Sequence, residues 1–227
     1  MKKLLLIALC AALPAVAGAQ TQTVNTFQRA QLWNVDPGNA HPSPADLWAF
    51  ESGGSGYYPL LQADFSSLAG RTVLGNGTFN IYFRDSYQDA YSVESIALRA
   101  INNGWDEGTA TYNSFFATNG FGATINTQTV TYNGAPYWVS FVVPQAVLQG
   151  WLSAPSTSNG VALENLGGYS SNGHTDMIFK DTEALRANFV FETEAVVATP
   201  EPVSVVLLAT GLVGLLGVSI RRRNSGA

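Results

Sequence analysis

Residues 24–196 contain no apolar stripe of helical spacing longer than two turns. Their apolar residues gather instead in short runs rich in β-branched and aromatic side chains, a pattern that favours strands. Glycine, asparagine, serine and proline separate these runs, as in Asn102–Gly104. Many short strands with turn residues between them predict an all-β sandwich or barrel. The expected strands are Leu60–Phe65, Gly77–Arg84, Ser95–Ile101, Thr127–Tyr132, Tyr137–Val143, Gly160–Asn165, Met177–Lys180 and Ala187–Thr193.

Two local patterns refine this expectation. The dipeptide Asn133-Gly134 is typical of a tight turn, so we expect a hairpin between Thr129–Tyr132 and Tyr137–Phe141. The one helix expected is the short segment Pro144–Leu152, whose apolar side chains cover one end of the fold. Those side chains are Val147, Leu148 and Trp151.

Charge is distributed unevenly along the chain. The 16 acidic and 11 basic residues give a net charge of −5, but five of the basic residues stand near the two ends: Lys2, Lys3, Arg221, Arg222 and Arg223. Residues 20–199 carry 15 acidic and 6 basic residues, a net charge of −9. Such an acidic segment repels phosphate backbones, which argues against nucleic-acid binding.

Few side chains are available for nucleophilic or metal chemistry. The single cysteine, Cys10, lies in the first apolar run, so the middle of the chain has no disulfide and no thiolate ligand. His41 and His174 are the only imidazoles. Two histidines far apart in sequence offer little for a histidine-based metal centre or general base.

The N-terminus has the features of a secretory signal peptide. Met-Lys-Lys precedes the apolar run Leu4–Val16, and Ala17-Gly18-Ala19 is the small-residue pattern that signal peptidase accepts. We therefore expect residues 1–19 to be removed after Ala19 during export. Lipidation of Cys10 is disfavoured because Leu9 precedes it, where that processing requires a small residue.

An uncharged apolar segment lies near the C-terminus. Residues 203–220 would span roughly 27 Å as a helix, close to the thickness of a bilayer core. The cluster Arg221–Arg223 follows at once and favours the cytoplasmic side, which places the acidic middle outside the membrane. The glycines Gly211, Gly214 and Gly217 are three residues apart rather than four, so a simple membrane anchor is favoured over helix dimerisation.

The tripeptide Pro200-Glu201-Pro202 stands just before this segment. The order of Pro-Glu-Pro, apolar helix and arginine cluster resembles a PEP-CTERM sorting signal. This resemblance implies recognition by an exosortase, a membrane-embedded processing enzyme of Gram-negative bacteria that make exopolysaccharide. The two prolines hold an extended backbone that such an enzyme can thread. The alternative is an ordinary single-pass anchor with prolines before its helix. The residues assigned to the sorting signal are Pro200, Glu201, Pro202, Arg221, Arg222 and Arg223.

Several segments of the middle occur in a family-like order: Leu60–Gly70, Gly77–Phe83, Trp105–Asn113, Trp138–Phe141 with Val147–Trp151, and Asn159–Leu163. This order resembles the DNRLRE domain family over residues 28–193. The resemblance implies an exported, jelly-roll-like antiparallel β-sandwich of the kind found in surface proteins and beside polysaccharide-active enzymes, where some members bind carbohydrate. Tyr112 stands where the family usually has tryptophan. The chain then divides into a signal peptide (1–19), this domain (20–196) and the sorting signal (197–227).

Trp105, Glu107 and Tyr112 are the candidate carbohydrate-binding residues. Aromatic planes cover the apolar face of a pyranose, and carboxylates accept hydrogen bonds from its hydroxyls. The favoured alternative is that Trp105 and Tyr112 are core residues and that Glu107 caps a turn, because large aromatic side chains are mostly buried. For the same reason Trp151 is expected in the core.

No cofactor is predicted. Structural calcium remains an alternative, with Asp85 and Asp89 flanking a turn and Asp106 beside Glu107. Calcium needs six to eight oxygen ligands from separated segments, so solvated surface carboxylates are favoured.

The catalytic signatures are incomplete. Gly53–Tyr57 lacks one glycine and the strand-turn-helix setting of a nucleophile elbow, so we interpret it as a loop. His174 and Asp176 lie in a polar loop without a nucleophile.

These observations predict an exported, non-enzymatic surface or extracellular-matrix protein associated with exopolysaccharide or biofilm. Its expected partners are signal peptidase, an exosortase and extracellular polysaccharide, and its precursor is held in the membrane by the C-terminal helix. Two alternatives remain open: a carbohydrate-binding module with a defined glycan site, and, less favoured, a polysaccharide hydrolase, which would need two carboxylates facing each other across a cleft.

Overall fold

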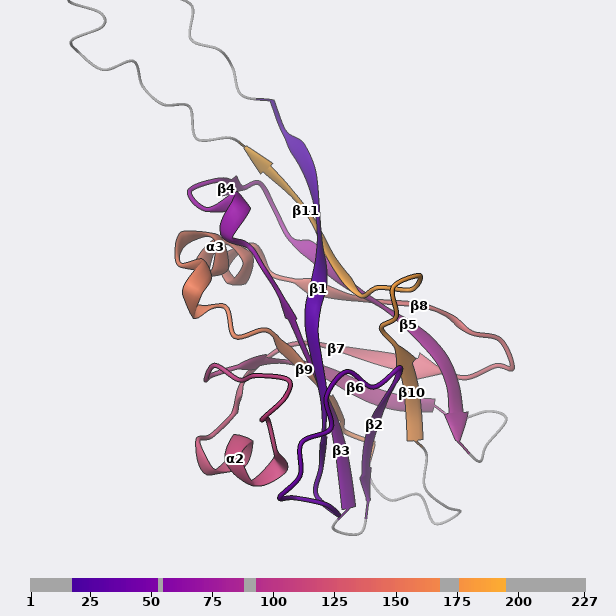
Figure 1. Ribbon diagram of the computed structural model, residues 1–227. Coiled ribbons are helices and arrows are strands. Elements are labelled where there is room, and N and C mark those ends of the chain that lie inside the picture. The colour runs from indigo at the N-terminus through magenta and orange to yellow at the C-terminus, as the bar shows by residue number, and fades with distance from the viewer. Residues whose placement is uncertain (1–17, 53–54, 88–92, 168–175, 195–227) are drawn as a thin grey trace, which may run out of the picture. The chain divides into compact units, whose positions relative to one another are not determined.

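The chain forms strands in which buried and exposed side chains often alternate, and every pairing between these strands is antiparallel. The computed structural model describes residues 18–52, 55–87, 93–167 and 176–194 (Figure 1). Of these residues, 53% lie in strands and 13% in helices, so the predicted all-β class is confirmed for this part of the chain. No helix within the described ranges is long and apolar enough to cross a bilayer.

Both predicted processing segments fall largely outside the described ranges. Of the predicted signal peptide, only residues 18 and 19 are described, and none of the predicted sorting segment 197–227 is. The assignments made there therefore stay predictions from the sequence. They concern Pro200, Glu201, Pro202, the apolar residues 203–220, Arg221, Arg222 and Arg223.

The elements follow in a fixed order along the chain. The strands are β1 (Gln20–Trp33), β2 (Asp46–Ser52), β3 (Ser55–Ala63), β4 (Thr72–Val73), β5 (Gly77–Tyr87), β6 (Val93–Ile101), β7 (Phe121–Thr131), β8 (Tyr137–Val143), β9 (Val161–Asn165), β10 (Asp176–Lys180) and β11 (Asn188–Glu194). The helices are α2 (Tyr112–Ala117), α3 (Gln145–Ser153) and the 3₁₀ turns η1 (Ser66–Leu68) and η2 (Pro155–Thr157).

All eight predicted strands are present, with ends shifted by a few residues, and the predicted short helix is α3. The strands β1, β2 and β4 and the helix α2 were not predicted. Most of the first half of β1 is made of glutamine, threonine and asparagine, which gives little apolar alternation to detect. Ser55–Tyr57, which was interpreted as part of a loop, begins β3 instead.

Six strands close into a barrel in the order β1–β11–β5–β10–β2–β3 and back to β1. Strands β1 and β2 close the barrel, because each changes its pairing partner along its length. Residues 20–25 of β1 pair with β11 and residues 26–33 pair with β3. Residues 46–49 of β2 pair with β10 and residues 50–52 pair with β3. The long strand β1 therefore runs along the domain from β11 to β3 (Figure 1).

Strands outside the barrel extend the sheet from β5 and from β3. We call the set β4, β5, β8, β10 and β11 the β5 half, and the set β3, β6, β7 and β9 the β3 half. The β5 half ends at β8, which pairs with β5, and the β3 half ends at β7, which pairs with β6. The shared strands β1 and β2 thus join the halves on one side, and the open side carries β7 and β8.

The hairpin predicted around Asn133-Gly134 is wrong. The strand before this turn, β7, pairs with β6, and the strand after it, β8, pairs with β5. Gly134 does adopt a positive φ of 91°, as the turn signal requires. A turn signal specifies local backbone geometry but not the partner of each strand, and here the turn carries the chain from one half to the other.

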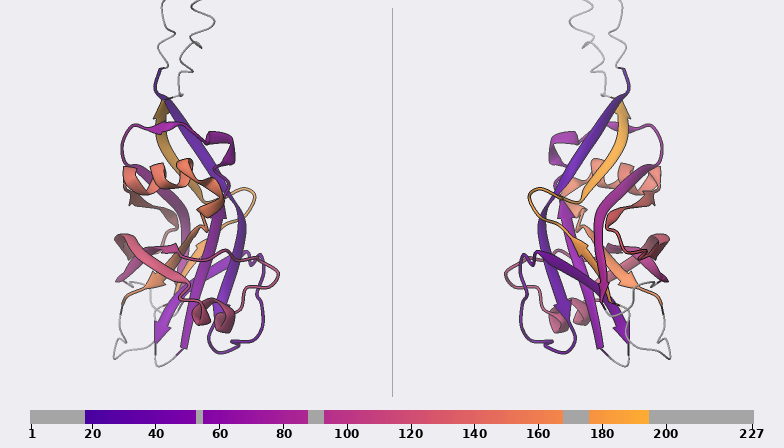
Figure 2. Two further views of the ribbon diagram at one scale, coloured as in Figure 1. Left: turned by 90° about the vertical axis from the view of Figure 1, so that its left-hand side faces the viewer. Right: turned by 90° about the vertical axis from the view of Figure 1, so that its right-hand side faces the viewer.

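The main core lies between the two halves. Phenylalanines from the β5 half fill its centre, and Phe79 packs 4.8 Å from Phe189 between ring centroids. As predicted, α3 contributes Leu148, which is fully buried, and Val147 and Trp151, which pack partly buried against the core. The side views show α3 nearer the end where β1 begins and β11 ends, with α2 towards the other end (Figure 2).

A buried carboxylate holds the point where β1 changes partner. β1 has an irregularity between Thr26 and Gln28, directly at the change from β11 to β3. The Asp181 carboxylate, 1% exposed, accepts hydrogen bonds from the Thr26 hydroxyl at 2.9 Å and from the Ala187 backbone N–H at 2.9 Å. Arg29 Nη1 lies 3.8 Å from Asp181 Oδ2. These contacts fasten the bulge to the segment before β11.

Burial raises the pKa of the Asp181 carboxyl, although the Ala187 N–H, the Thr26 hydroxyl and the guanidinium groups of Arg29 and Arg186 oppose the shift. A raised folded-state pKa gives a contribution to stability that is complete below the ordinary pKa of the group and is lost as the pH rises through the raised value. We therefore expect the free energy of unfolding of the wild type, minus that of Asp181→Asn, to fall as the pH rises from about 4. Denaturant unfolding at a series of pH values measures this difference.

Asp64→Asn is the matched control. Asp64 is exposed, and hydrogen bonds from Ser66 lower its pKa. Its contribution to stability is therefore present above its ordinary pKa and is lost on acidification, so its difference curve slopes the opposite way. If the Asp181 curve also rose with pH, the two arginines would outweigh the cost of burial.

Candidate functional site

A second apolar cluster lies on the outer face of the β3 half. Its buried members come from β1, β3, β6, β9 and the segment after β6: Ala30, Leu32, Tyr58, Leu60, Ile101, Ala110, Phe115 and Ala162. Alternate residues of the same strands, such as Leu61, face the main core. The β3 half is therefore buried on both faces, and residues 102–120 cover the outer one.

Polar contacts fix the shape of this covering segment. The Asp106 carboxylate accepts a hydrogen bond from the Gly108 N–H at 3.0 Å, and the Asp106 carbonyl accepts one from Ala110 N–H at 2.8 Å. Helix α2 then begins with a capping box, in which the side chains of Thr111 and Ser114 each accept a hydrogen bond from the other's backbone N–H. Asn102 donates to the carbonyls of residues 119 and 121, which ties the end of the segment to its start.

Trp105 is half-buried near the start of the covering segment. Its ring packs against the second cluster, and its indole N–H donates a hydrogen bond of 2.8 Å to the carbonyl of Asn159. Asn159 in turn donates to the carbonyl of Asn102, so the two segments are tied in both directions. The expectation that Trp105 supports the core agrees with these contacts, but part of the side chain remains accessible.

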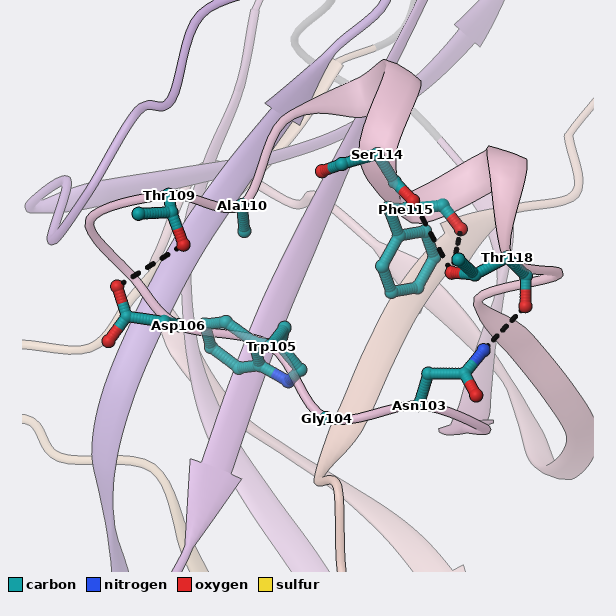
Figure 3. Close-up of a pocket in the computed structure, with 9 residues that line it drawn as sticks. All are labelled: Asn103, Gly104, Trp105, Asp106, Thr109, Ala110, Ser114, Phe115 and Thr118. Atoms are coloured by element: carbon teal, nitrogen blue, oxygen red, sulfur yellow. Dashed lines mark hydrogen bonds between the residues drawn. The ribbon is translucent and has the colours of Figure 1, made fainter.

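A pocket of about 310 Å³ lies beside Trp105. Figure 3 shows the indole between two polar groups, with Asp106 and Thr109 on one side and Asn103 and Thr118 on the other. The remaining lining residues are Gly104, Ala110, Ser114 and Phe115. The pocket therefore combines aromatic surface with hydroxyl, amide and carboxylate groups, the mixture that a sugar requires.

The Glu107 side chain forms its hydrogen bonds with residues outside the pocket. Its Oε2 atom accepts hydrogen bonds from the Ser43 hydroxyl at 3.1 Å and from the Arg29 backbone N–H at 3.4 Å. Ser43 has a positive φ of 47° and donates its own N–H to the Arg29 carbonyl. Glu107 thus connects the covering segment to the loop after β1, and it does not line the pocket.

Tyr112 also lies away from the pocket lining. Its ring is 4.3 Å from that of Phe116 and 6.2 Å from that of Tyr58, so it packs over the second cluster. Trp151 packs partly buried against the main core as expected and stacks on Phe65 at 5.4 Å. Of the three candidate carbohydrate residues, the structure places Trp105 alone at the pocket.

The carboxylates considered for calcium do not converge. Asp106 bonds within its own turn, whereas Glu107 bonds to Ser43 and Arg29. Asp85 lies on β5, and Asp89 is outside the described residues. In the ranges that the structure describes, no three histidine, cysteine, aspartate or glutamate side chains are grouped to hold a metal ion.

The imidazole His41 is part of an aromatic contact. It stacks on Trp33 with ring centroids 3.8 Å apart, and its Nε2 atom is 3.3 Å from Asp36 Oδ2. The predicted loop pair, His174 and the side chain of Asp176, lies outside the described part of the chain.

Sequence reasoning missed four polar residues of the pocket: Asn103, Thr109, Ser114 and Thr118. Asn103 was interpreted only as part of a turn between strands. The capping box that begins α2 carries serine where glutamate or glutamine is usual, so its sequence signal is weak. Recognising Thr111 as a helix N-cap would have predicted the turn that brings residues 114 and 118 to the pocket.

The contacts of Trp105 predict a cost for its removal. Trp105→Ala leaves a cavity against the second cluster and an unpaired Asn159 carbonyl, so we expect a loss of about 2–4 kcal/mol in the free energy of unfolding. Phe27 is 53% exposed, and Phe27→Ala is the matched control, with an expected loss of about 1 kcal/mol or less. Denaturant unfolding followed by circular dichroism measures both. Equal losses for the two variants would contradict the supporting role of Trp105.

Comparison with known proteins gives no family. No protein-family model matches the chain, and no curated protein matches it. The proposals that follow therefore rest on the residues quoted above and on the geometry of the described domain.

Proposed function

We propose that this chain is an exported, non-enzymatic surface or extracellular-matrix protein of a Gram-negative bacterium. In this proposal residues 1–19 direct export and are removed by signal peptidase. Residues 197–227 act as a PEP-CTERM-like sorting signal that an exosortase recognises and cleaves. The β domain between them has DNRLRE-like, jelly-roll connectivity and associates with exopolysaccharide.

The order of the C-terminal segments carries this proposal. Pro200-Glu201-Pro202, the uncharged residues 203–220 and the cluster Arg221, Arg222 and Arg223 follow one another without interruption. Proline before a helix and arginine after an apolar span are each common, but their combination with a cleavable N-terminal segment is characteristic of an exported and processed protein.

The geometry of the domain is compatible with attachment through its C-terminal end. Gln20 at the start of β1 pairs with Thr193 near the end of β11, so the chain enters and leaves the domain at neighbouring points. Helix α2 lies towards the other end of the domain (Figure 1). Within the described domain, the end of β11 and the helix that follows the Trp105 segment thus lie at opposite ends (Figure 1).

Processing predicts a defined mature C-terminus. In the native-type host we expect the surface form to end before residue 203, because cleavage removes the apolar segment together with the arginines. In a host without an exosortase the chain should remain in the membrane fraction, since an apolar span of this length dissociates extremely slowly. Mass spectrometry of the protein from both hosts measures the outcome.

Proline variants sharpen this test. The double change Pro200→Ala and Pro202→Ala should leave the tail uncleaved in the native-type host, whereas Pro136→Ala, in the turn between β7 and β8, should be processed normally. A mature surface form that still contains Arg221–Arg223 would refute the sorting signal.

A carbohydrate-binding module with a defined site is the second candidate function. The pocket beside Trp105 favours it, because a partly exposed indole lies among the side chains of Asn103, Asp106 and Thr109. A saccharide can cover the free part of the indole with its apolar face while its hydroxyls bond to these groups. The lining area is small, so we expect one or two sugar rings rather than a long chain.

Asp106→Asn tests this site with little change of shape. A carboxylate accepts a stronger hydrogen bond than an amide, so we expect binding of the cognate saccharide to weaken on the order of tenfold. Asp64→Asn is the matched control, because Asp64 also accepts a hydrogen bond from the backbone N–H two residues ahead. Glycan-array screening followed by calorimetry measures both. Saccharide binding that is the same in the two variants would place the site elsewhere.

A further inference from the structure

Strand β8 is an open edge of the β5 half. Among the described residues it pairs with β5 alone. The paired residues run from Tyr137, opposite Phe83, to Val143, opposite Gly77. The backbone N–H and C=O groups on its other edge therefore have no strand partner there. Such an edge is a template for another strand, and proteins commonly block it with lysine, proline or a bulge.

None of these blocking features occurs in β8. Its seven residues, Tyr-Trp-Val-Ser-Phe-Val-Val, contain no charge, no proline and no glycine, and its pairing with β5 is free of register shifts. Two of its outward side chains are large and apolar, with Trp138 44% and Val142 40% exposed. An extended, regular and apolar edge of this kind favours strand addition.

We propose that β8 is a self-association interface, at which β8 of a second copy adds antiparallel so that the two β5 halves form one continuous sheet. The central residue, Ser140, then lies on the two-fold axis opposite the Ser140 of the second copy. In this register Trp138 faces the second Val142, and Val142 faces the second Trp138. Both exposed apolar side chains of each copy are thereby covered in aromatic-to-β-branched pairs, which stabilise antiparallel strands.

The charge distribution permits a second copy at this surface. Residues 20–199 carry a net charge of −9, so two copies repel each other across most orientations. Residues 108–163, which include β7, β8 and α3, contain no charged side chain. The open side of the domain is therefore a region where two acidic copies can meet without like charges facing each other.

The neighbouring edge, β7, fits this role less well. Its pairing with β6 has register shifts near Arg99, which make that edge irregular. The hydroxyl of Tyr137 accepts a hydrogen bond from the Thr131 N–H at 3.0 Å. The exposed positions of β7 are mainly threonine, which gains little from being covered.

Charge exchange at the two-fold axis tests the proposal. In the full-length protein, held in a non-ionic detergent, we expect the wild type to form dimers in the micromolar range by sedimentation. Ser140→Lys alone and Ser140→Glu alone should each weaken association on the order of tenfold, because each places like charges directly opposite each other. An equal mixture of the two variants should restore dimers, since Lys then faces Glu. Restoration also shows that both variants are folded.

Cysteine cross-linking tests the register. With Cys10→Ser as the background, Ser140→Cys should give a covalent dimer under mild oxidation. Thr23→Cys is the matched control, because Thr23 is an exposed residue on the other edge of the same sheet face. The strand spacing predicts that two such residues lie about 30 Å apart in the dimer, so they should not cross-link.

Association that persists unchanged in both charged variants would assign it to another surface and overturn the proposal. A wild type that stays monomeric across the micromolar range would also overturn it, as would a mixture of charged variants that does not restore dimers. Strand addition by a different protein predicts a monomeric wild type on its own, so the same measurement separates the two partners.

Discussion

The change of partner within β1 is the constraint on which the barrel depends. A strand that leaves β11 and joins β3 must break its regular pairing, and this occurs between Thr26 and Gln28. The buried Asp181 carboxylate holds that break through the Thr26 hydroxyl and the Ala187 N–H, with Arg29 nearby. A buried carboxylate is costly unless such donors surround it, so its bonds fix one backbone geometry at the junction. Without that geometry β1 could pair with one side of the domain but not with both.

This junction also decides which side of the domain stays open. Because β1 and β2 are each shared between the halves, the barrel closes along them, and the extensions of both halves end at β7 and β8. The outer face of the β3 half is then covered by residues 102–120, whereas β8 keeps one edge without a strand partner among the described residues. The candidate pocket and the candidate self-association edge are thus different consequences of one closure, and they lie on different halves.

The sequence predicted the features that depend on local side-chain patterns and missed those that depend on pairing between distant strands. Strand β11 was found because its side chains alternate between apolar and polar, and β8 because it is rich in β-branched and aromatic residues. β1 was missed because its first half is mostly polar on both faces, and its position is set by pairing with β11 and β3. The hairpin at Asn133-Gly134 failed for the same reason, since long-range packing sends its two strands to different halves.

The candidate site shows the same limit at the scale of side chains. Trp105, Glu107 and Tyr112 are close in sequence, but each bonds or packs with a different partner. The indole N–H of Trp105 is already bonded to Asn159, so that group is not available to a ligand, and the packed part of the ring cannot stack on a sugar. Any selectivity of the pocket must therefore come from the polar groups around the exposed part of the ring, such as Asn103, and from the helical turn that brings Thr118 to the pocket. These residues are defined by the fold of the covering segment rather than by a sequence motif, which is why the motif located the aromatic residue but not its polar neighbours.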